Sequence, residues 1–289
     1  MKFKLIVAPM SGITDVAFNH LCKFYGADLT YTEFISSAGF VRNPDKYLYK
    51  FKKLEPGLKA VQLFGNNIKE IIESARILET YFDIIDINAG CPVYKVIKTG
   101  SGSELLKKPK LIGEIVKQLS NNLNKPVSVK IRIGIDQNYI NALNIARIIE
   151  DNGASFITIH GRTQKQMYSG KANWDIIYTV KRNIRIPVIG NGDVKDKETY
   201  YKHINFVDGV MIGRGIMKNP GLIKEIKQNK KINMFQMFRD YLYFAKKYNI
   251  TFNRIKLHAI HFFKSKKMRA DMVRTKNLDE LLNIINKYK

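Results

Sequence analysis

The amino-acid sequence predicts an α/β protein that folds as a (β/α)8 barrel, also called a TIM barrel, followed by a C-terminal helical domain. A short apolar run, a turn rich in Gly, Asn, Pro or Asp, and a helical pattern recur along the chain, which is typical of βα units. Eight such apolar runs precede Pro220, and about 220 residues is an ordinary size for this barrel. An open, doubly wound sheet is the competing fold, because strand counts from one sequence are error-prone.

The elements of the barrel are expected within residues 1–224. Residues 68–81 and 141–151 place apolar side chains three and four positions apart, which predicts helices that pack one face against a sheet. The eight predicted strands are residues 5–10, 29–34, 60–65, 84–88, 127–133, 156–162, 187–191 and 209–212.

Residues 225–289 are expected to form a basic helical domain. Helices are predicted at residues 235–248, 255–267 and 278–288. The whole chain carries 49 Lys and Arg against 25 Asp and Glu, a formal charge of +24, and this domain holds 16 of the cations but 5 of the acids. Such a surface repels itself unless a polyanion shares it, so nucleic acid is an expected partner. A single cluster, such as residues 264–267, is more often only a solvated surface.

Composition disfavours several other classes of protein. Hydrophobic residues make up 45% of the chain, enough for an ordinary globular core. The apolar runs are shorter than the roughly 18 residues of a membrane helix, and the first four residues lack the apolar core of a signal sequence. We therefore expect a cytoplasmic protein without a membrane partner. Two cysteines, Cys22 and Cys91, cannot build a disulfide framework, and no spacing typical of metal ligands is present, so no metal is expected.

Polar side chains are expected to point into the barrel at the ends of several strands. Side chains alternate along a strand, and those at the C-terminal mouth of a barrel build its active site. In residues 127–133 the apolar positions face the helices, which turns Lys130 and Arg132 inward, where two cations require an anion. Local hydrogen bonds could satisfy any one such group, but burying many without partners would cost about 1–3 kcal/mol each. The same alternation selects Gln62, Asp86, Asn88, Thr158, His160 and Arg162.

Cys91 is expected on a loop at this mouth. It follows a strand end and precedes Pro92. A thiol with a pKa near about 8.5 is mostly protonated at pH 7 and can donate a proton. An isolated cysteine is more often a small buried hydrophobe, and we interpret Cys22 in this way because it lies in an amphipathic helical pattern.

Glycine-rich turns follow the last two predicted strands, at residues 190–193 and 213–215. Loops at these places commonly bind phosphate in this fold, because glycine lets backbone N–H groups approach the oxygens and a cation such as Arg214 adds charge-assisted bonds. Each turn alone is a weak signal, since turns use glycine anyway. Together they predict a phosphorylated ligand. The turn at residues 8–12 lies on the same rim and could let a flat ring stack on its backbone.

These segments, in this order, resemble the tRNA-dihydrouridine synthases. The matching segments are APMSGITD (8–15), VQLFG (61–65), DINAGCP (86–92), GSGSELL (100–106), VKIRIG (129–134), IHGRT (159–163), GNGD (190–193) and IGRG (212–215). The tail, with His258 and the basic stretch to Arg274, resembles the RNA-binding helical domain of the family more loosely. The sequence departs from the family at Ser11, where Ala is frequent, and at Glu104, where a small residue is usual; the role of Glu104 in the pocket stays open.

The resemblance implies an FMN enzyme that uses NADPH to reduce the C5–C6 double bond of particular uridines in tRNA. Hydride would pass from N5 of reduced FMN to uracil C6, and Cys91 would protonate C5. Gln62 would bond the pyrimidine edge of the flavin, Lys130 would lie near its N1 and C2 carbonyl, and His160 would lie between flavin and substrate. The flavin ring would be lined by Pro9, Met10 and Ser11. The phosphate would be held by Asn191, Gly192, Asp193, Gly213 and Arg214. The uracil would be held by Asn88, Arg132 and Arg162.

Two alternatives to this function stay open. An FMN-dependent oxidoreductase of a free pyrimidine, of the dihydroorotate or dihydropyrimidine type, would use similar chemistry but has no need of such positive charge. An RNA-binding protein could keep the barrel only as a scaffold, although the polar rim looks complete for catalysis. For reduction, a uridine within folded RNA would have to leave its stack, at a cost of a few kcal/mol.

Overall fold

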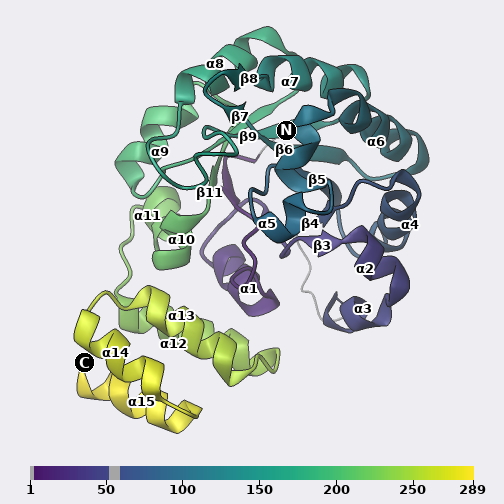
Figure 1. Ribbon diagram of the computed structural model, residues 1–289. Coiled ribbons are helices and arrows are strands. Elements are labelled where there is room, and N and C mark those ends of the chain that lie inside the picture. Colours follow the sequence, from purple (N-terminus) through teal and green to yellow (C-terminus); the bar gives the residue numbers. More distant parts are fainter. Residues whose placement is uncertain (1–2, 52–58) are drawn as a thin grey trace.

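Eight parallel strands form the wall of a barrel in the computed structural model, which describes residues 3–51 and 59–289 (Figure 1). Neighbouring strands pair in the order β1-β11-β10-β9-β6-β5-β4-β2, and a parallel bridge between Ile6 and Leu29 brings β1 next to β2. The predicted (β/α)8 barrel is confirmed, and the open sheet is wrong. The wall strands are β1 (Leu5–Val7), β2 (Thr30–Tyr31), β4 (Lys59–Phe64), β5 (Ile84–Ala89), β6 (Val127–Arg132), β9 (Phe156–His160), β10 (Val188–Asn191) and β11 (Gly209–Ile212).

The second predicted strand is interrupted. Residues 29–34 were expected to be continuous, but β2 is followed by a separate strand, β3 (Ile35–Ser36), and both pair with β4. Thr30 pairs with Lys59 whereas Ile35 pairs with Leu63, so one extra residue bulges out between the two pairings.

Amphipathic helices cover the outside of the barrel (Figure 1). The predicted helix at residues 68–81 is α4 (Ile68–Leu78), which begins after Asn67 because the Asn67 side chain accepts the N–H groups of the first turn. The helix predicted at 141–151 is α7 (Ala142–Asp151). The other covering helices are α1 (Val16–Phe24), α6 (Pro109–Asn122), α8 (Trp174–Asn183) and α9 (Lys197–Ile204).

Apolar side chains fill the barrel interior near the amino ends of the strands, and polar side chains fill it toward the carboxyl ends. Ile6, Leu29, Phe156, Ile189 and Met211 form one buried cluster inside the wall. The loops above them carry short elements that the strand pattern did not predict. These are α2 (Ser37–Arg42), α3 (Asp45–Phe51), α5 (Tyr94–Ile97), the 3-10 helix η1 (Gly102–Lys107), and the hairpin of β7 (Gly134–Asp136) and β8 (Tyr139–Ile140).

The last part of the chain is helical, as predicted, and lies beside α1 (Figure 1). The predicted helix at residues 255–267 is wrong in its extent. It ends at Phe262, and a new helix begins after Ser265, whose hydroxyl accepts the Met268 N–H at 3.3 Å. The helices are α10 (Arg214–Lys218), α11 (Leu222–Gln228), α12 (Met234–Lys247), α13 (Phe252–Phe262), α14 (Lys266–Arg274) and α15 (Leu278–Lys287). None of the described helices is long and apolar enough to cross a membrane.

Helix α12 packs directly against α1 of the barrel. The Tyr25 hydroxyl donates to Asp240 at 2.6 Å, and the His20 ring stacks on Phe244 with 4.0 Å between ring centroids. The helical region therefore covers apolar surface that the barrel would otherwise expose. Helix α11 spans residues 224 and 225, and the domain division there stays a prediction.

Gly190 on β10 provides a test of the packing beneath the mouth. A Cβ at Gly190 would lie 2.2 Å from Trp174 Cζ3. Gly190→Ala should therefore lower the free energy of unfolding by about 1–3 kcal/mol, the usual cost of overpacking, as measured by urea denaturation. The same substitution in a Trp174→Phe background should cost less, because the outer ring of the indole is gone. An equal cost in both backgrounds would contradict this account.

Candidate active site

A chain of buried polar side chains crosses the barrel interior from β6 through β5 to β4 and leads up to the carboxyl end of β5. Ser128 Oγ donates to Asp86 Oδ1 at 2.5 Å, and Gln62 Nε2 donates to Asp86 Oδ2 at 2.7 Å. Asn88 Nδ2 then donates to Gln62 Oε1 at 2.8 Å. Burial raises the pKa of Asp86 to about 6, although the hydrogen bonds from Ser128 and Gln62 favour the carboxylate. An ionised carboxylate only accepts hydrogen bonds, so it fixes the orientation of both amides.

Five hydrogen bonds to two consecutive residues, Gly90 and Cys91, hold the Cys91 loop. Asn88 Oδ1 accepts the N–H groups of Gly90 at 3.1 Å and Cys91 at 2.9 Å. Ser103 donates its own N–H and its hydroxyl to the Cys91 carbonyl, at 3.0 and 2.8 Å. Arg132 Nε additionally donates to the Gly90 carbonyl at 2.9 Å. The backbone that carries the thiol is therefore held on both sides.

The Cys91 thiol is half-buried at the mouth. Burial raises the pKa of Cys91 above its usual value, although the nearby cations Arg132 and Lys130 oppose this. The thiol is therefore protonated at neutral pH, as a proton donor must be. Cys22, in contrast, is fully buried on α1 within the apolar core, which confirms the interpretation from its helical pattern.

Lys130 and His160 lie within a field of positive charge. Burial and the neighbouring Arg132 lower the pKa of Lys130 to about 8. No described residue makes a hydrogen bond or an ion pair to its ammonium. Burial and the cations around it, among them Lys130 and Arg162, lower the pKa of His160 well below its usual value. His160 is therefore neutral at pH 7, and the mouth still requires an anion.

The Arg132 guanidinium is almost fully buried. Besides Gly90, it donates through Nη1 to the carbonyls of Thr163 and Met167, both at 2.8 Å. Arg132 thus joins the Cys91 loop to the loop that follows β9. The contact of Arg132 with uracil stays a prediction. Among the described residues, Nη2 of Arg132 has no hydrogen-bond partner, so it is the nitrogen that could make this contact.

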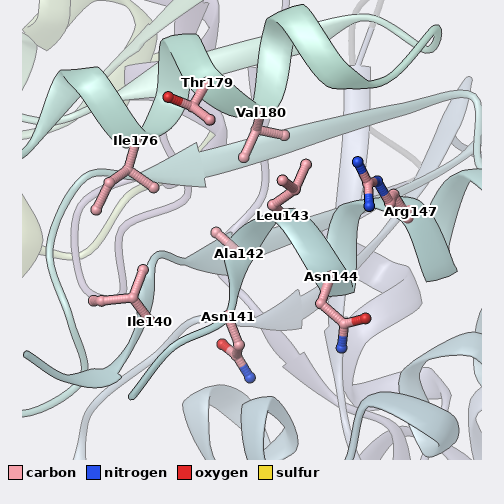
Figure 2. Close-up of a pocket in the computed structure, with 9 residues that line it drawn as sticks. All are labelled: Ile140, Asn141, Ala142, Leu143, Asn144, Arg147, Ile176, Thr179 and Val180. Atoms are coloured by element: carbon pink, nitrogen blue, oxygen red, sulfur yellow. The ribbon is translucent and has the colours of Figure 1, made fainter. Parts of the chain in front are cut away.

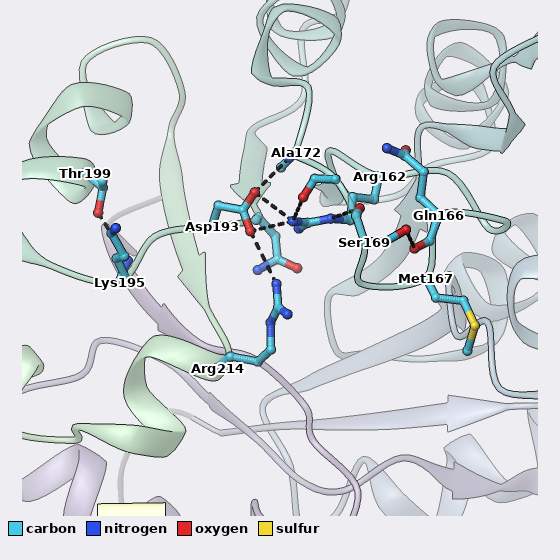
Figure 3. Close-up of polar contacts among 12 residues, drawn as sticks. Arg162, Gln166, Met167, Ser169, Ala172, Asp193, Lys195, Thr199 and Arg214 are labelled. Atoms are coloured by element: carbon cyan, nitrogen blue, oxygen red, sulfur yellow. Dashed lines mark hydrogen bonds and ion pairs between the residues drawn. The ribbon is translucent and has the colours of Figure 1, made fainter. Parts of the chain in front are cut away.

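Asp193 lies between two arginines at the end of β10 (Figure 3). Its carboxylate accepts from Arg162 Nη2 at 2.8 Å, from Arg214 Nη2 at 3.3 Å and from the Ala172 N–H at 2.8 Å. Burial opposes ionisation, but hydrogen bonds from Ala172 and Arg162 hold the pKa of Asp193 below its usual value. The carboxylate would repel a phosphate, so its side chain is suited to positioning the two arginines, and only its N–H is suited to the phosphate itself.

Arg162 is placed by a loop and not by strand alternation, because β9 ends at His160. Its guanidinium is buried and donates to the carbonyls of Ser169 at 3.0 Å and Gly170 at 2.6 Å. Nη1 of Arg162 is buried without a hydrogen-bond partner. A donor in this state costs free energy unless a ligand accepts from it.

The two glycine turns lie against each other and against the loop after β1. Asn191 Nδ2 donates to the Met211 carbonyl at 2.7 Å, which ties β10 to β11. Gly192 has a left-handed φ of 134°, and a Cβ there would lie 2.6 Å from Ala172 Cβ. A Cβ at Gly213 would lie 3.7 Å from Met10 Sδ. The structure therefore brings the predicted phosphate turns and the predicted ring-binding loop to one rim.

Sequence reasoning missed several residues of this site. Ser128 occupies the same face of β6 as Lys130, so strand alternation alone could have identified it. Ser103 lies within the matched segment GSGSELL, but no role was predicted for its hydroxyl. Glu104, left open above, forms an ion pair with Lys107 on its own helix at 2.9 Å. Among the described residues no group of His, Cys, Asp or Glu could hold a metal ion.

A hollow of about 450 Å³ lies elsewhere, between α7 and α8 on the outside of the barrel (Figure 2). Its wall is mainly apolar, with Arg147 as its single charged side chain. It contains none of the predicted site residues and lacks groups suited to redox or proton-transfer chemistry. Its lining residues are Ile140, Asn141, Ala142, Leu143, Asn144, Arg147, Ile176, Thr179 and Val180.

The structure defines a TIM barrel whose mouth is lined by polar and cationic side chains. An old yellow enzyme homologue from Zymomonas mobilis aligns with a TM-score of 0.59 at 11% identity, over 81% of this chain and 92% of that one, which shows a shared fold. The chain belongs to the dihydrouridine synthase family, whose model matches residues 6–288.

Relatives of this family are similar over most of the chain. The tRNA-dihydrouridine synthase B of Shewanella oneidensis is 39% identical over 231 residues, covering 78% of this chain and 72% of that protein. The protein of the same name from Pasteurella multocida is 40% identical, with coverages of 78% and 69%. A probable tRNA-dihydrouridine synthase of Aquifex aeolicus is 40% identical, with coverages of 81% and 75%.

The raised pKa of Cys91 predicts how its reactivity depends on pH. Only the thiolate is alkylated, so the rate of modification by iodoacetamide should be low at neutral pH and should reach half its maximum at a higher pH than the rate for free cysteine. Mass spectrometry after timed quenching measures this rate, and Cys91→Ala shows the background from buried Cys22. A half-maximal rate at or below pH 8 would contradict the account of the thiol.

Proposed function

We propose that this protein reduces the C5–C6 double bond of particular uridines in tRNA, in the cytoplasm, with FMN as cofactor and NADPH as electron donor. The observation that carries the proposal is the Cys91 thiol on a backbone held by Asn88 and Ser103 at the mouth of the barrel, near Lys130 and Arg132. Membership of the dihydrouridine synthase family supports the same chemistry.

The residues present fit a phosphorylated, anionic cofactor such as FMN. The Lys130 ammonium makes no hydrogen bond or ion pair with a described residue, and the attraction of Asp86 does not offset the effects of burial and of Arg132 on its pKa. A bound anion would stabilise the charged form of Lys130. When bound and reduced, FMN would supply the hydride that uracil C6 receives. The residues that would hold it are Pro9, Met10, Ser11, Gln62, Lys130, His160, Asn191, Gly192, Asp193, Gly213 and Arg214.

Each of these groups has a definable task. Lys130 is protonated below about pH 8 and would place positive charge against the ring edge that becomes electron-rich. Gln62 uses one of its two Nε2 hydrogens on Asp86, which leaves the other for a ligand. His160 is neutral, so it can hydrogen-bond between ring and substrate without adding to the positive charge of the mouth.

Cys91 would donate the proton to C5 on the face of the uracil opposite the hydride. Its backbone is held by Asn88 and Ser103, so the part of the chain that carries the thiol has little freedom to move away from the substrate. Asn88 and Arg162 would hold the uracil, with Arg132 beside them. Positioning of this kind accounts for much of the rate that a protein provides.

A tRNA substrate is favoured over a free pyrimidine by the charge of the helical region. Lys264, Lys266, Lys267 and Arg269 are exposed around the start of α14, where they can contact a phosphate backbone. A uridine within folded RNA must leave its stack to reach the barrel mouth, and contacts to the backbone offset that cost. A scaffold without catalysis would have no use for an aligned thiol and an unpartnered buried Arg162 donor.

Reduction of unmodified tRNA in vitro tests the proposal. The purified protein should bind FMN and form dihydrouridine when it is supplied with NADPH, as measured by mass spectrometry of digested tRNA. Cys91→Ala should bind FMN and tRNA as the parent does but turn over about 10²–10⁴-fold more slowly, the usual contribution of a general acid. Failure of the parent to bind FMN would contradict the proposal. Near-normal turnover by Cys91→Ala would remove Cys91 from the mechanism.

Charge on α14 should decide tRNA affinity. Lys266→Glu with Lys267→Glu should weaken tRNA binding by about tenfold and flatten its dependence on salt, since each phosphate contact contributes to the salt slope. Lys110→Glu with Lys117→Glu, which changes the same charge on exposed positions of α6, is the control. Equal tRNA affinity of the two double variants in filter binding would rule out this surface.

A further inference from the structure

The loop after β1 folds on itself beside the predicted phosphate turn. The Met10 carbonyl accepts the N–H groups of Ile13 and Thr14, each at 3.0 Å, and the Met10 N–H donates to Thr14 Oγ1 at 3.1 Å. Gly12 takes a left-handed φ of 81° within this loop. These bonds shape the loop from within, but the positions of its two ends depend on other parts of the chain.

The first end is held by a carboxylate from the interrupted second strand. Glu33 lies between β2 and β3, and its Oε2 accepts the Gly12 N–H at 3.0 Å. Arg254 of α13 holds that carboxylate with both terminal nitrogens: Nη1 lies 2.8 Å from Oε1, and Nη2 donates to Oε2 at 3.4 Å. A residue of the C-terminal helical region is thus one side chain away from the backbone of the loop.

The second end is held by the same helix. Asp15 caps α1 by accepting the Phe18 N–H at 2.9 Å, and its other oxygen lies 3.1 Å from His258 Nε2. The Tyr241 hydroxyl donates to the same oxygen at 3.3 Å. His258 is fully buried and stacks on Phe18, with 4.9 Å between ring centroids. His258 and Arg254 are four residues apart on α13 and therefore lie on one face of the helix. From this face His258 reaches Asp15 directly, and Arg254 reaches the Gly12 N–H through Glu33.

We propose that α13 positions the loop that lines the flavin, with Arg254 acting through Glu33 and His258 acting through Asp15. This inference rests on the proposed function, because the loop contains Pro9, Met10 and Ser11. The Arg254–Glu33 pair does more than join two surface charges, because Glu33 also accepts the N–H of Gly12, which has a left-handed φ. The helical region therefore has a second task besides contact with RNA: it sets the shape of the cofactor site.

The Glu33–Arg254 ion pair is only partly buried, so its loss should leave the protein folded and reveal its effect on FMN. Arg254→Met and Glu33→Gln should each weaken FMN affinity by about fivefold, measured by quenching of FMN fluorescence on the protein freed of flavin, and should alter the visible circular dichroism of bound FMN. Arg254→Lys should recover part of the affinity. Arg239→Met is the matched control, because Arg239 on α12 contacts Gln236 of its own helix.

The double variant Arg254→Met/Glu33→Gln separates positioning from general destabilisation. Its loss of FMN affinity should equal that of either single variant, because both changes break the same link. Parent-like affinity in both single variants, or losses that add, would overturn the inference. If Arg254→Met unfolds, as its thermal melting would show, Glu33→Gln decides the question alone. A parent that binds no FMN would defeat the proposed function as well, whereas a parent that binds FMN with unaffected variants would defeat only this inference.

Discussion

The acceptor-only chemistry of the Asp86 carboxylate orients the polar groups that lead to the thiol. Asp86 accepts from Ser128 and Gln62, which turns the Gln62 carbonyl toward Asn88 and leaves Asn88 Oδ1 for the backbone of Cys91. Burial works against this ionised form and raises the pKa of Asp86 to about 6. The hydrogen bonds keep Asp86 ionised at neutral pH, so a charge buried one layer below the mouth helps to fix the backbone that carries the Cys91 thiol.

Positive charge at the mouth is only partly balanced within the protein. Asp193 pairs with Arg162 and Arg214, but Lys130 and one nitrogen of Arg162 keep no described partner. Burial, together with the same positive charge, lowers the pKa of His160 and keeps it neutral at pH 7. Unbalanced buried positive charge lowers the free energy of unfolding, and a bound anionic ligand would offset that loss. The electrostatics of the mouth therefore favour an anionic ligand over an apolar one.

Strand alternation predicted the barrel mouth well where strands are regular. Lys130 lies inside because Val129 and Ile131 are buried on the other face of β6, as the two-residue period requires. The prediction failed where one extra residue changed the register between β2 and β3, since a bulge leaves no mark in an apolar pattern. The break before α14 carried a local signal, the capping Ser265, which the apolar periodicity of residues 255–267 concealed.

The sequence by itself determined the fold class, the parallel strands and the residue types that gather at their carboxyl ends, because these follow from local periods and turn chemistry. Only the tertiary structure decided which of those groups bond to each other. Arg162 meets Asp193 across 31 positions, and Arg254 meets Glu33 across 221. Partners so distant are chosen by how the elements pack in three dimensions, and no local pattern of charge or hydrophobicity encodes that choice.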